Sequence, residues 1–235
     1  MLIGIVVLLV GLSIWGQYLR FFLGSVDMRA SMEIGLDLLT HKFYMDAETN
    51  IPTWFNTVLL VWVAMLFWFI GAMKRREKAP FRWHWMGLGA LFGVLSIDEL
   101  AVLHEMLIQP FRDLTGVGGW FYFAWLLPGI AFVALMALVY AAFFYRLERK
   151  TRTLMLFSLA VYFAGVIGGE MLSGRVASLI GQRNFTYAVI ASLEESVEMT
   201  GAALLIYSLL KYIERFHGHV RLMIGLGSAA AEDRR

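Results

Sequence analysis

The chain has 235 residues, of which 60% are hydrophobic and only 16% are charged. Soluble domains carry closer to a quarter charged residues, so the composition excludes an ordinary water-soluble protein and indicates a single-domain integral membrane protein. The absence of cysteine excludes disulfides, thiolate metal ligands and thiol redox chemistry. The formal net charge of +2 says little about partners, because the basic residues are arranged for membrane topology.

Six segments are apolar and close to the roughly 20 residues that a helix needs to cross a bilayer. A membrane strand needs only about half that length, so the segments are expected to be helical. They are residues 2–23, 54–73, 83–107, 120–145, 154–172 and 185–212. The sequence therefore predicts an all-α, polytopic membrane helix bundle with six transmembrane helices, which form a single transmembrane domain over residues 1–221.

The segment between the first two spans, residues 25–53, is long for a loop. Its apolar residues recur at helical spacing with charged residues between them. These apolar residues are Met28, Met32, Leu36, Leu39 and Phe43. The pattern predicts an amphipathic helix on the outer membrane surface, although a helical loop capping the bundle fits it equally well. Asp46 and Glu48, in the turn-rich DAETNIPTW, are better explained as surface acids than as a roof over a site.

The distribution of Lys and Arg predicts the orientation of the chain. Fourteen of the 20 fall on one side, in the loops 74–82 and 146–152 and in the segment from Lys211 onward. The positive-inside rule places this side and both termini in the cytoplasm, with residues 222–235 as a disordered cytoplasmic tail. The segments SIDELAVLHE and DAETNIPTW resemble small bacterial membrane proteins. The resemblance implies a bacterial inner membrane location and carries no function across.

Acidic residues are concentrated inside three of the six expected spans, although each costs roughly 2.5–3.5 kcal/mol to insert. The ionisable residues of these spans are Asp98, Glu99, His104 and Glu105 in the third, Glu170 in the fifth, and Glu194, Glu195 and Glu198 in the sixth. Counting along each helix places them all in the outer half of the bundle. Asp98 and Glu105 are seven residues apart and are expected to share one helix face, whereas Glu99 fits the inward face least well.

The chemistry of this set points to a cation, because no Lys or Arg lies in mid-span to pair with it. Protonated, hydrogen-bonded acids or a water-filled cavity are the alternatives. Carboxylates with an imidazole suit iron, manganese or zinc, and carboxylates alone suit calcium. We predict a divalent metal site, with iron or manganese favoured and zinc or calcium as alternatives. Its ligands are drawn from Asp98, His104, Glu105, Glu170, Glu194, Glu195 and Glu198.

Three function classes follow from these features. The first is a membrane oxidoreductase that acts on a lipid or quinone-like substrate at the metal site. The second is a non-catalytic accessory subunit of a larger membrane complex. The third is a proton- or cation-coupled transporter, which is disfavoured because no acidic residue occupies the inner half of a span. Phosphate-loop, HExxH and nucleic-acid motifs are missing, so the expected partners are the lipid bilayer and other membrane subunits, with no nucleic acid.

Overall fold

A computed structural model describes residues 1–22 and 35–217, and within them every element of regular secondary structure is helical. The predicted all-α class is therefore confirmed. The long helices are α1 (Leu2–Phe22), α3 (Ile51–Arg76), α4 (Arg82–Ala101), α6 (Leu126–Arg146), α7 (Arg149–Phe163), α8 (Glu170–Ile180) and α9 (Phe185–His217). The short helical pieces are η1 (Leu38–Lys42), η2 (His104–Leu107), α5 (Ile108–Thr115), η3 (Gly119–Phe121) and η4 (Ala164–Gly169).

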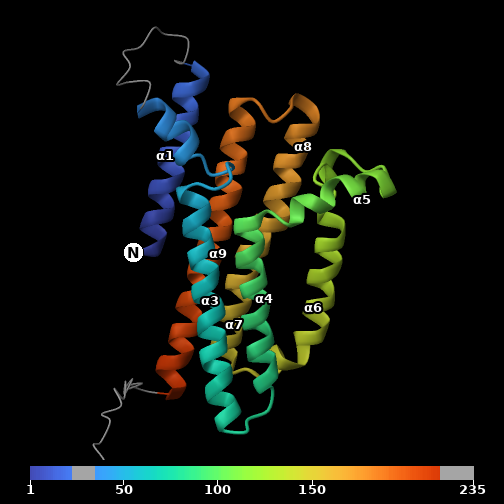
Figure 1. Ribbon diagram of the computed structural model, residues 1–235. Coiled ribbons are helices and arrows are strands. Elements are labelled where there is room, and N and C mark those ends of the chain that lie inside the picture. The colour runs from blue at the N-terminus through green and yellow to red at the C-terminus, as the bar shows by residue number, and fades with distance from the viewer. Residues whose placement is uncertain (23–34, 218–235) are drawn as a thin grey trace, which may run out of the picture.

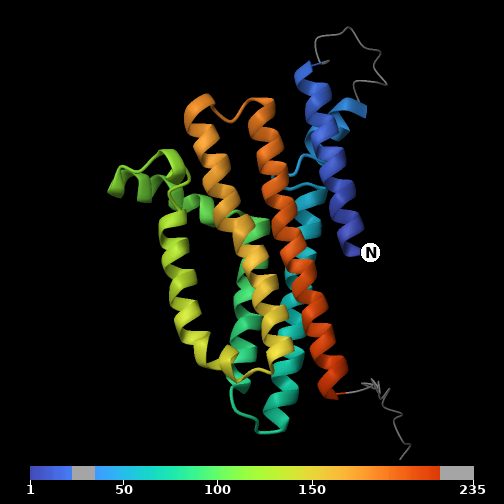
Figure 2. The same cartoon turned by 180° about the vertical axis from the view of Figure 1, so that it is seen from behind.

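The long helices form an elongated bundle (Figures 1 and 2). α9 is its central helix, because it packs against α1, α3, α7 and α8. α3 pairs along its length with α4. α1 is offset along the bundle axis and lies beside the half of α9 that follows the α8–α9 turn (Figure 2). α6 descends along one side of the bundle and stands off from it (Figure 1).

Within residues 1–22 and 35–217, four helical stretches are long and apolar enough to cross a membrane: α1, α3, α6 and the run Arg149–Ile180. A fifth is obtained if α4 and the helical pieces that follow it, which are bent by 80° relative to each other, are counted as one broken span. α9 covers the expected sixth span but does not belong to this set, and four glutamates lie within it. Length and composition therefore support an integral membrane protein with four or five spans.

The expected third span, residues 83–107, is broken in the structure. α4 ends at Ala101, and Val102 adopts the left-handed conformation with φ of 54°. A branched side chain is rarely found in this conformation, so the backbone is strained where the helix stops. The prediction of one straight helix through residue 107 was wrong, because the chain turns away into η2 and α5.

The expected fifth span, residues 154–172, is instead part of a longer helical run from Arg149 to Ile180. A π-helical turn, η4, interrupts this run at Ala164–Gly169. The amphipathic helix expected in residues 25–53 lies partly outside the described residues, and the expected tail 222–235 lies wholly outside them. In its described part, η1 packs against α1.

α3 begins with a well-formed cap that fixes the position of the residues after it. The Asn50 side chain accepts a hydrogen bond of 3.0 Å from the Thr53 backbone N–H, and Pro52 occupies the first turn. Both features favour helix initiation. The cap places Asn56 two turns into the bundle, where its side chain is fully buried.

The interior and exterior of the bundle are both apolar, as expected in a bilayer. Phe67, Phe92 and Leu205 belong to the main core and are at most 1% exposed. Large apolar side chains also cover the outside, including Trp68 and Leu138. A soluble protein rarely exposes apolar surface on this scale, so the exterior is suited to contact with lipid.

Glycines let α9 approach the α7–η4 segment closely. A Cβ built on Gly169 would lie 2.6 Å from the Glu194 Cγ atom and 3.2 Å from its Cα atom. A Cβ on Gly165 would lie 2.8 Å from the Glu198 backbone nitrogen. Gly201 on α9 lies equally close to the Tyr162 backbone. Because backbone atoms are among the obstacles, side-chain rotation alone cannot make room for a methyl group.

Gly169→Ala is therefore expected to destabilise the protein by about 1–3 kcal/mol, since α9 must move away from η4. Gly168→Ala is the matched control, because nothing lies within 4 Å of a Cβ at the adjacent position. Thermal unfolding of both variants in the same detergent measures the difference. Equal midpoints for the two variants would contradict the proposed close packing at Gly169.

Candidate functional site

The broken end of α4 folds the chain back onto Asp98. The Asp98 Oδ1 atom accepts a hydrogen bond of 2.8 Å from the His104 backbone N–H, and its Oδ2 atom lies 2.9 Å from the His104 Nδ1 atom. The left-handed Val102 makes this return possible, because it reverses the chain between the two residues. Strain in the backbone is often retained at functional sites.

The Asp98–His104 contact assigns a role to each ring nitrogen. A carboxylate only accepts hydrogen bonds, so the contact favours the tautomer with the proton on Nδ1. Nε2 is then the nitrogen that can accept a proton or bind a metal. Both Asp98 oxygens are used in holding His104, so Asp98 is placed to orient the imidazole.

Trp125 connects this end of α4 to the carboxylates of α8 and α9. Its indole ring lies 4.9 Å, centroid to centroid, from the His104 ring. The indole N–H donates a hydrogen bond of 2.9 Å to the Glu170 Oε1 atom. Glu170 in turn lies beside Glu194. A continuous set of contacts therefore runs from α4 through Trp125 to α9.

The acidic residues of α9 are held deep in the bundle. Glu194 and Glu198 are only 7% and 9% exposed, and both lie against the glycines of η4. Glu195 lies within electrostatic range of Glu198 and of Glu99 on α4. The acidic cluster therefore consists of Asp98, Glu99, Glu170, Glu194, Glu195 and Glu198. The structure brings Glu99 into it, although the helical phase of Glu99 in the sequence argued against this.

Asn56 is a member of the cluster that sequence reasoning missed. Its side chain is fully buried beside the Glu99 carboxyl group. Neither its amide nitrogen nor its amide oxygen makes a hydrogen bond of good geometry, and the Glu99 carboxyl group is its polar neighbour. Leaving a buried amide unpaired costs about 1–3 kcal/mol. A lone Asn in an apolar span was the available signal, since polar residues in membrane helices need a reason.

Glu105 lies apart from the buried members of the cluster. It belongs to η2, after the break, and its side chain is exposed. The expectation that Asp98 and Glu105 share one helix face was wrong, because α4 ends between them. Glu105 remains within electrostatic range of Asp46, Glu48 and His104, so it occupies the rim.

Asp46 lies beside this rim and is not simply a surface acid of a turn, whereas Glu48 next to it is exposed, as expected. The Tyr187 hydroxyl donates a hydrogen bond of 3.1 Å to Asp46. Burial, with smaller contributions from the Glu170 and Glu105 charges, raises the pKa of Asp46 to about 6, against opposing hydrogen bonds from tyrosines. Partial loss of hydration, followed by the charges of Glu99 and Glu105, raises the pKa of the more accessible Glu48 to about 7.

The cluster is rich in carboxyl groups, and no Lys or Arg of the described residues pairs with them. Among the described residues, the His104 ring is the only cationic or potentially cationic group within 4 Å of its carboxylates. In the same part of the chain, no three His, Asp or Glu side chains are placed together closely enough to hold a metal ion as they stand. Coordination by three of them would require side-chain rotation.

The pKa of Asp46 predicts a stability that falls as the pH rises. An acid whose pKa is about 6 in the folded chain and about 4 in the unfolded chain binds more protons when folded, so ionisation between these values destabilises the fold. Between pH 4 and pH 7 this ionisation lowers the free energy of unfolding by about 2 kcal/mol, and Asp46→Asn should abolish that decrease.

Thermal unfolding in detergent with a chelator, followed from pH 4 to pH 7, measures this effect. Asp113→Asn, at an exposed position on α5, serves as the control and should keep the pH dependence of the unaltered protein. An Asp46→Asn profile that follows the control at every pH would contradict the assigned role of Asp46.

Comparison with known proteins gives a family but no activity. No curated protein and no solved structure matches the chain. One family model, described as a domain of unknown function, DUF8692, matches residues 1–212. That match covers nearly all of the described bundle, including every residue of the acidic cluster. The chain therefore belongs to the DUF8692 family.

Proposed function

We propose that the acidic cluster between α4, α8 and α9 binds a divalent metal, iron or manganese, and that the chain is a metal-dependent membrane oxidoreductase. The observation that carries the proposal is the meeting of carboxylates from three helices without a Lys or Arg partner among the described residues. The buried amide of Asn56, which makes no hydrogen bond of good geometry, adds a further polar group to the same region.

The electrostatic argument favours a bound cation. Two like charges about 4 Å apart repel by roughly 4 kcal/mol even at an effective dielectric constant of 20. Glu194 and Glu198 also lose hydration because they are buried. A cation offsets both costs at once, whereas protonation offsets them only by neutralising the acids. Binding energy for the metal would also contribute to folding.

The candidate ligands follow from the geometry. Glu194 and Glu198 supply buried carboxylates from α9, and Glu170 supplies a half-buried one from α8. His104 supplies Nε2 while Asp98 holds its ring. Glu99 and Glu195 border the same space, and Glu105 lies at its rim. The mixture of carboxylates and one imidazole suits iron or manganese. When bound, such a metal supplies one-electron redox chemistry at the end of α4.

The orientation in the membrane is part of the proposal. The basic segments 74–82 and 146–152 and the end of α9 gather at the same end of the bundle, opposite the α8–α9 turn (Figure 1). The positive-inside rule makes that end cytoplasmic and places the cluster toward the outer face. Six spans, with α9 as the sixth, and a bacterial inner membrane location complete this topology.

Single-cysteine labelling tests the orientation in a chain that has no native cysteine. Lys78→Cys should be inaccessible to an impermeant thiol reagent added outside intact cells, because it lies in the α3–α4 turn. Arg183→Cys, in the α8–α9 turn, should react readily and serves as the positive control. Labelling of Lys78→Cys but not of Arg183→Cys would reverse the topology.

Amide substitutions test the metal site. If a metal holds the cluster, Glu194→Gln and Asp98→Asn should each lower the affinity for iron or manganese at least tenfold, because losing a ligand or its orienting partner commonly costs 10–100-fold. The purified variants should therefore contain less metal. Both should also lower the unfolding midpoint. Elemental analysis and thermal unfolding of protein purified without chelator provide the two measurements.

Glu77→Gln is the control for this experiment, because Glu77 pairs with Lys74 at the opposite end of the bundle. It should retain the metal content of the unaltered protein. Metal-free protein whose amide variants unfold at the same or a higher temperature would reject the metal site. That result would favour neutral, hydrogen-bonded acids in a non-catalytic accessory subunit.

A further inference from the structure

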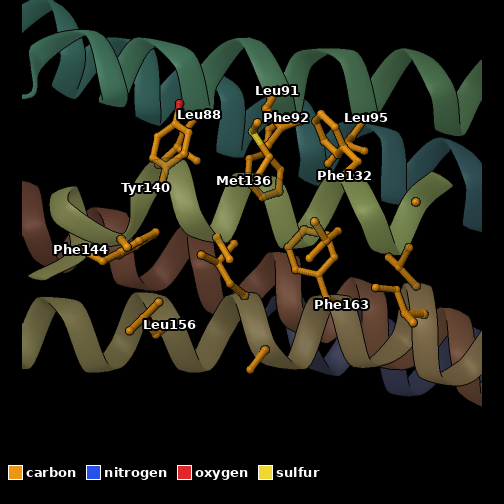
Figure 3. A pocket seen from close by; sticks show the side chains of 18 of the residues that line it. Leu88, Leu91, Phe92, Leu95, Phe132, Met136, Tyr140, Phe144, Leu156 and Phe163 are labelled. Carbon is orange, nitrogen blue, oxygen red and sulfur yellow. The ribbon is translucent and has the colours of Figure 1, made fainter. Parts of the chain in front are cut away.

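A large apolar cavity lies between α6 and the rest of the bundle. Its volume is about 660 Å³, and its walls come from α4, α6, α7 and η4. Leu91 and Leu95 line it from α4, Phe132 and Met136 from α6, and Phe163 from the end of α7 (Figure 3). It extends along nearly the whole of α6, from Trp125 to Tyr145. This cavity occupies the space by which α6 stands off from the bundle.

The size and lining of the cavity limit what can fill it. A transmembrane helix is about 10 Å across and about 30 Å long, which corresponds to roughly 2,000 Å³, so a helix from a partner or a second copy does not fit. Apolar cavities of this kind do not hold ordered water. The volume falls within the roughly 300–1,000 Å³ of small-molecule sites. A single hydrocarbon chain, drawn from the surrounding membrane, matches both the shape and the lining.

The outer end of the cavity ends at Trp125, whose indole ring separates it from the acidic cluster. The indole ring lines the cavity, its N–H donates to Glu170 at 2.9 Å, and its face lies against the His104 ring. Gly129 permits this position, because a Cβ there would lie 2.8 Å from the indole Cζ3 atom. A polar group attached to a chain in the cavity would therefore lie at the Trp125 ring, with Glu170 and His104 directly behind it.

The charges at the two ends distinguish one orientation of the chain from the other. The outer end is surrounded by carboxylates, which repel an anionic head group. At the inner end, Arg152 lines the cavity and donates a hydrogen bond of 3.1 Å to the Tyr145 carbonyl. An anionic phospholipid would place its phosphate at Arg152, whereas a neutral amphiphile would place its head at Trp125.

We infer that the cavity binds the hydrocarbon tail of a lipid-soluble substrate and presents a neutral, oxygen-containing head to Glu170 and His104 at the outer end. This inference rests on the proposed metal-dependent activity, and it specifies the substrate class of that site. Substrate enters sideways from the bilayer, between α6 and the bundle. The polar reaction site and the apolar binding site meet at Trp125.

Photolabelling with a long-chain fatty alcohol tests the inference. Two forms of the alcohol are used, with a diazirine either beside the hydroxyl group or at the methyl end. The first should label residues around Trp125 and Ile167, and the second residues around Tyr140 and Phe144. Excess unlabelled alcohol should suppress labelling on these cavity residues. It should leave labelling of the lipid-facing Leu138 unchanged, because that side chain is 76% exposed and lies outside the cavity.

Two neighbouring substitutions on α6 provide the matched pair. Ala137 lines the cavity and Leu138 does not, so Ala137→Trp should fill the cavity while Leu138→Trp adds the same ring to the lipid face. Competable labelling should fall about tenfold in the first variant, the equivalent of one decade in affinity. It should stay unchanged in the second.

Metal content is measured on the same samples, so that the two proposals can fail separately. Competable labelling in a metal-free protein would reject the metal site and leave the tail site standing. Bound metal without competable labelling would overturn the tail site alone. Labelling with the hydroxyl end beside Tyr145 and Arg152 would overturn the stated orientation and indicate a phospholipid instead. Loss of labelling to the same degree in Leu138→Trp would also overturn the inference.

Discussion

The close contact between α9 and the glycines of η4 is the constraint on which the rest of the site depends. Gly165 and Gly169 leave room for the Glu198 and Glu194 side chains where α9 crosses the helical run Arg149–Ile180. The π-helical turn places these glycines together, and such turns are frequent at functional sites. Without this approach the carboxylates would be separated by a layer of side chains. The packing that stabilises the bundle thus also concentrates charge in its interior.

The sequence predicted the helical class, because that class depends on properties counted along the chain. Apolar runs near 20 residues identified α3 and α6, and the spacing of acids from the helix ends placed Glu170 and Glu194 at similar depths. The prediction from sequence failed where the backbone conformation of one residue decides where a helix ends. Val102 has a side chain typical of helix or strand, so nothing in its identity announced the break that separates Asp98 from Glu105.

Other members of the site escaped sequence reasoning because tertiary contacts define them. Trp125 lies within an expected apolar span and was not singled out, and only the position of α8 reveals that its indole reaches Glu170. Asn56 lies within an otherwise apolar span, and its meaning depends on the proximity of Glu99 on another helix. Asp46 lies in a turn whose sequence is typical of surface loops, but Tyr187 of α9 holds it over the cluster. In each case the local sequence determines the helix or turn to which the residue belongs, but a residue on another helix determines what its side chain contacts.

The acidic cluster lies next to the apolar cavity, and this arrangement suits a reaction on a lipid-soluble substrate. Lipid tails and protein interiors both have a low dielectric constant, so charges at this boundary interact strongly and are poorly screened. A reaction centre there can hold a metal or a proton at fixed positions while the substrate approaches from the bilayer without crossing water. Trp125 is suited to the boundary because its ring is apolar and its N–H is a hydrogen-bond donor. The same residue therefore closes the polar site against lipid and limits how far a hydrocarbon chain can advance toward Glu170.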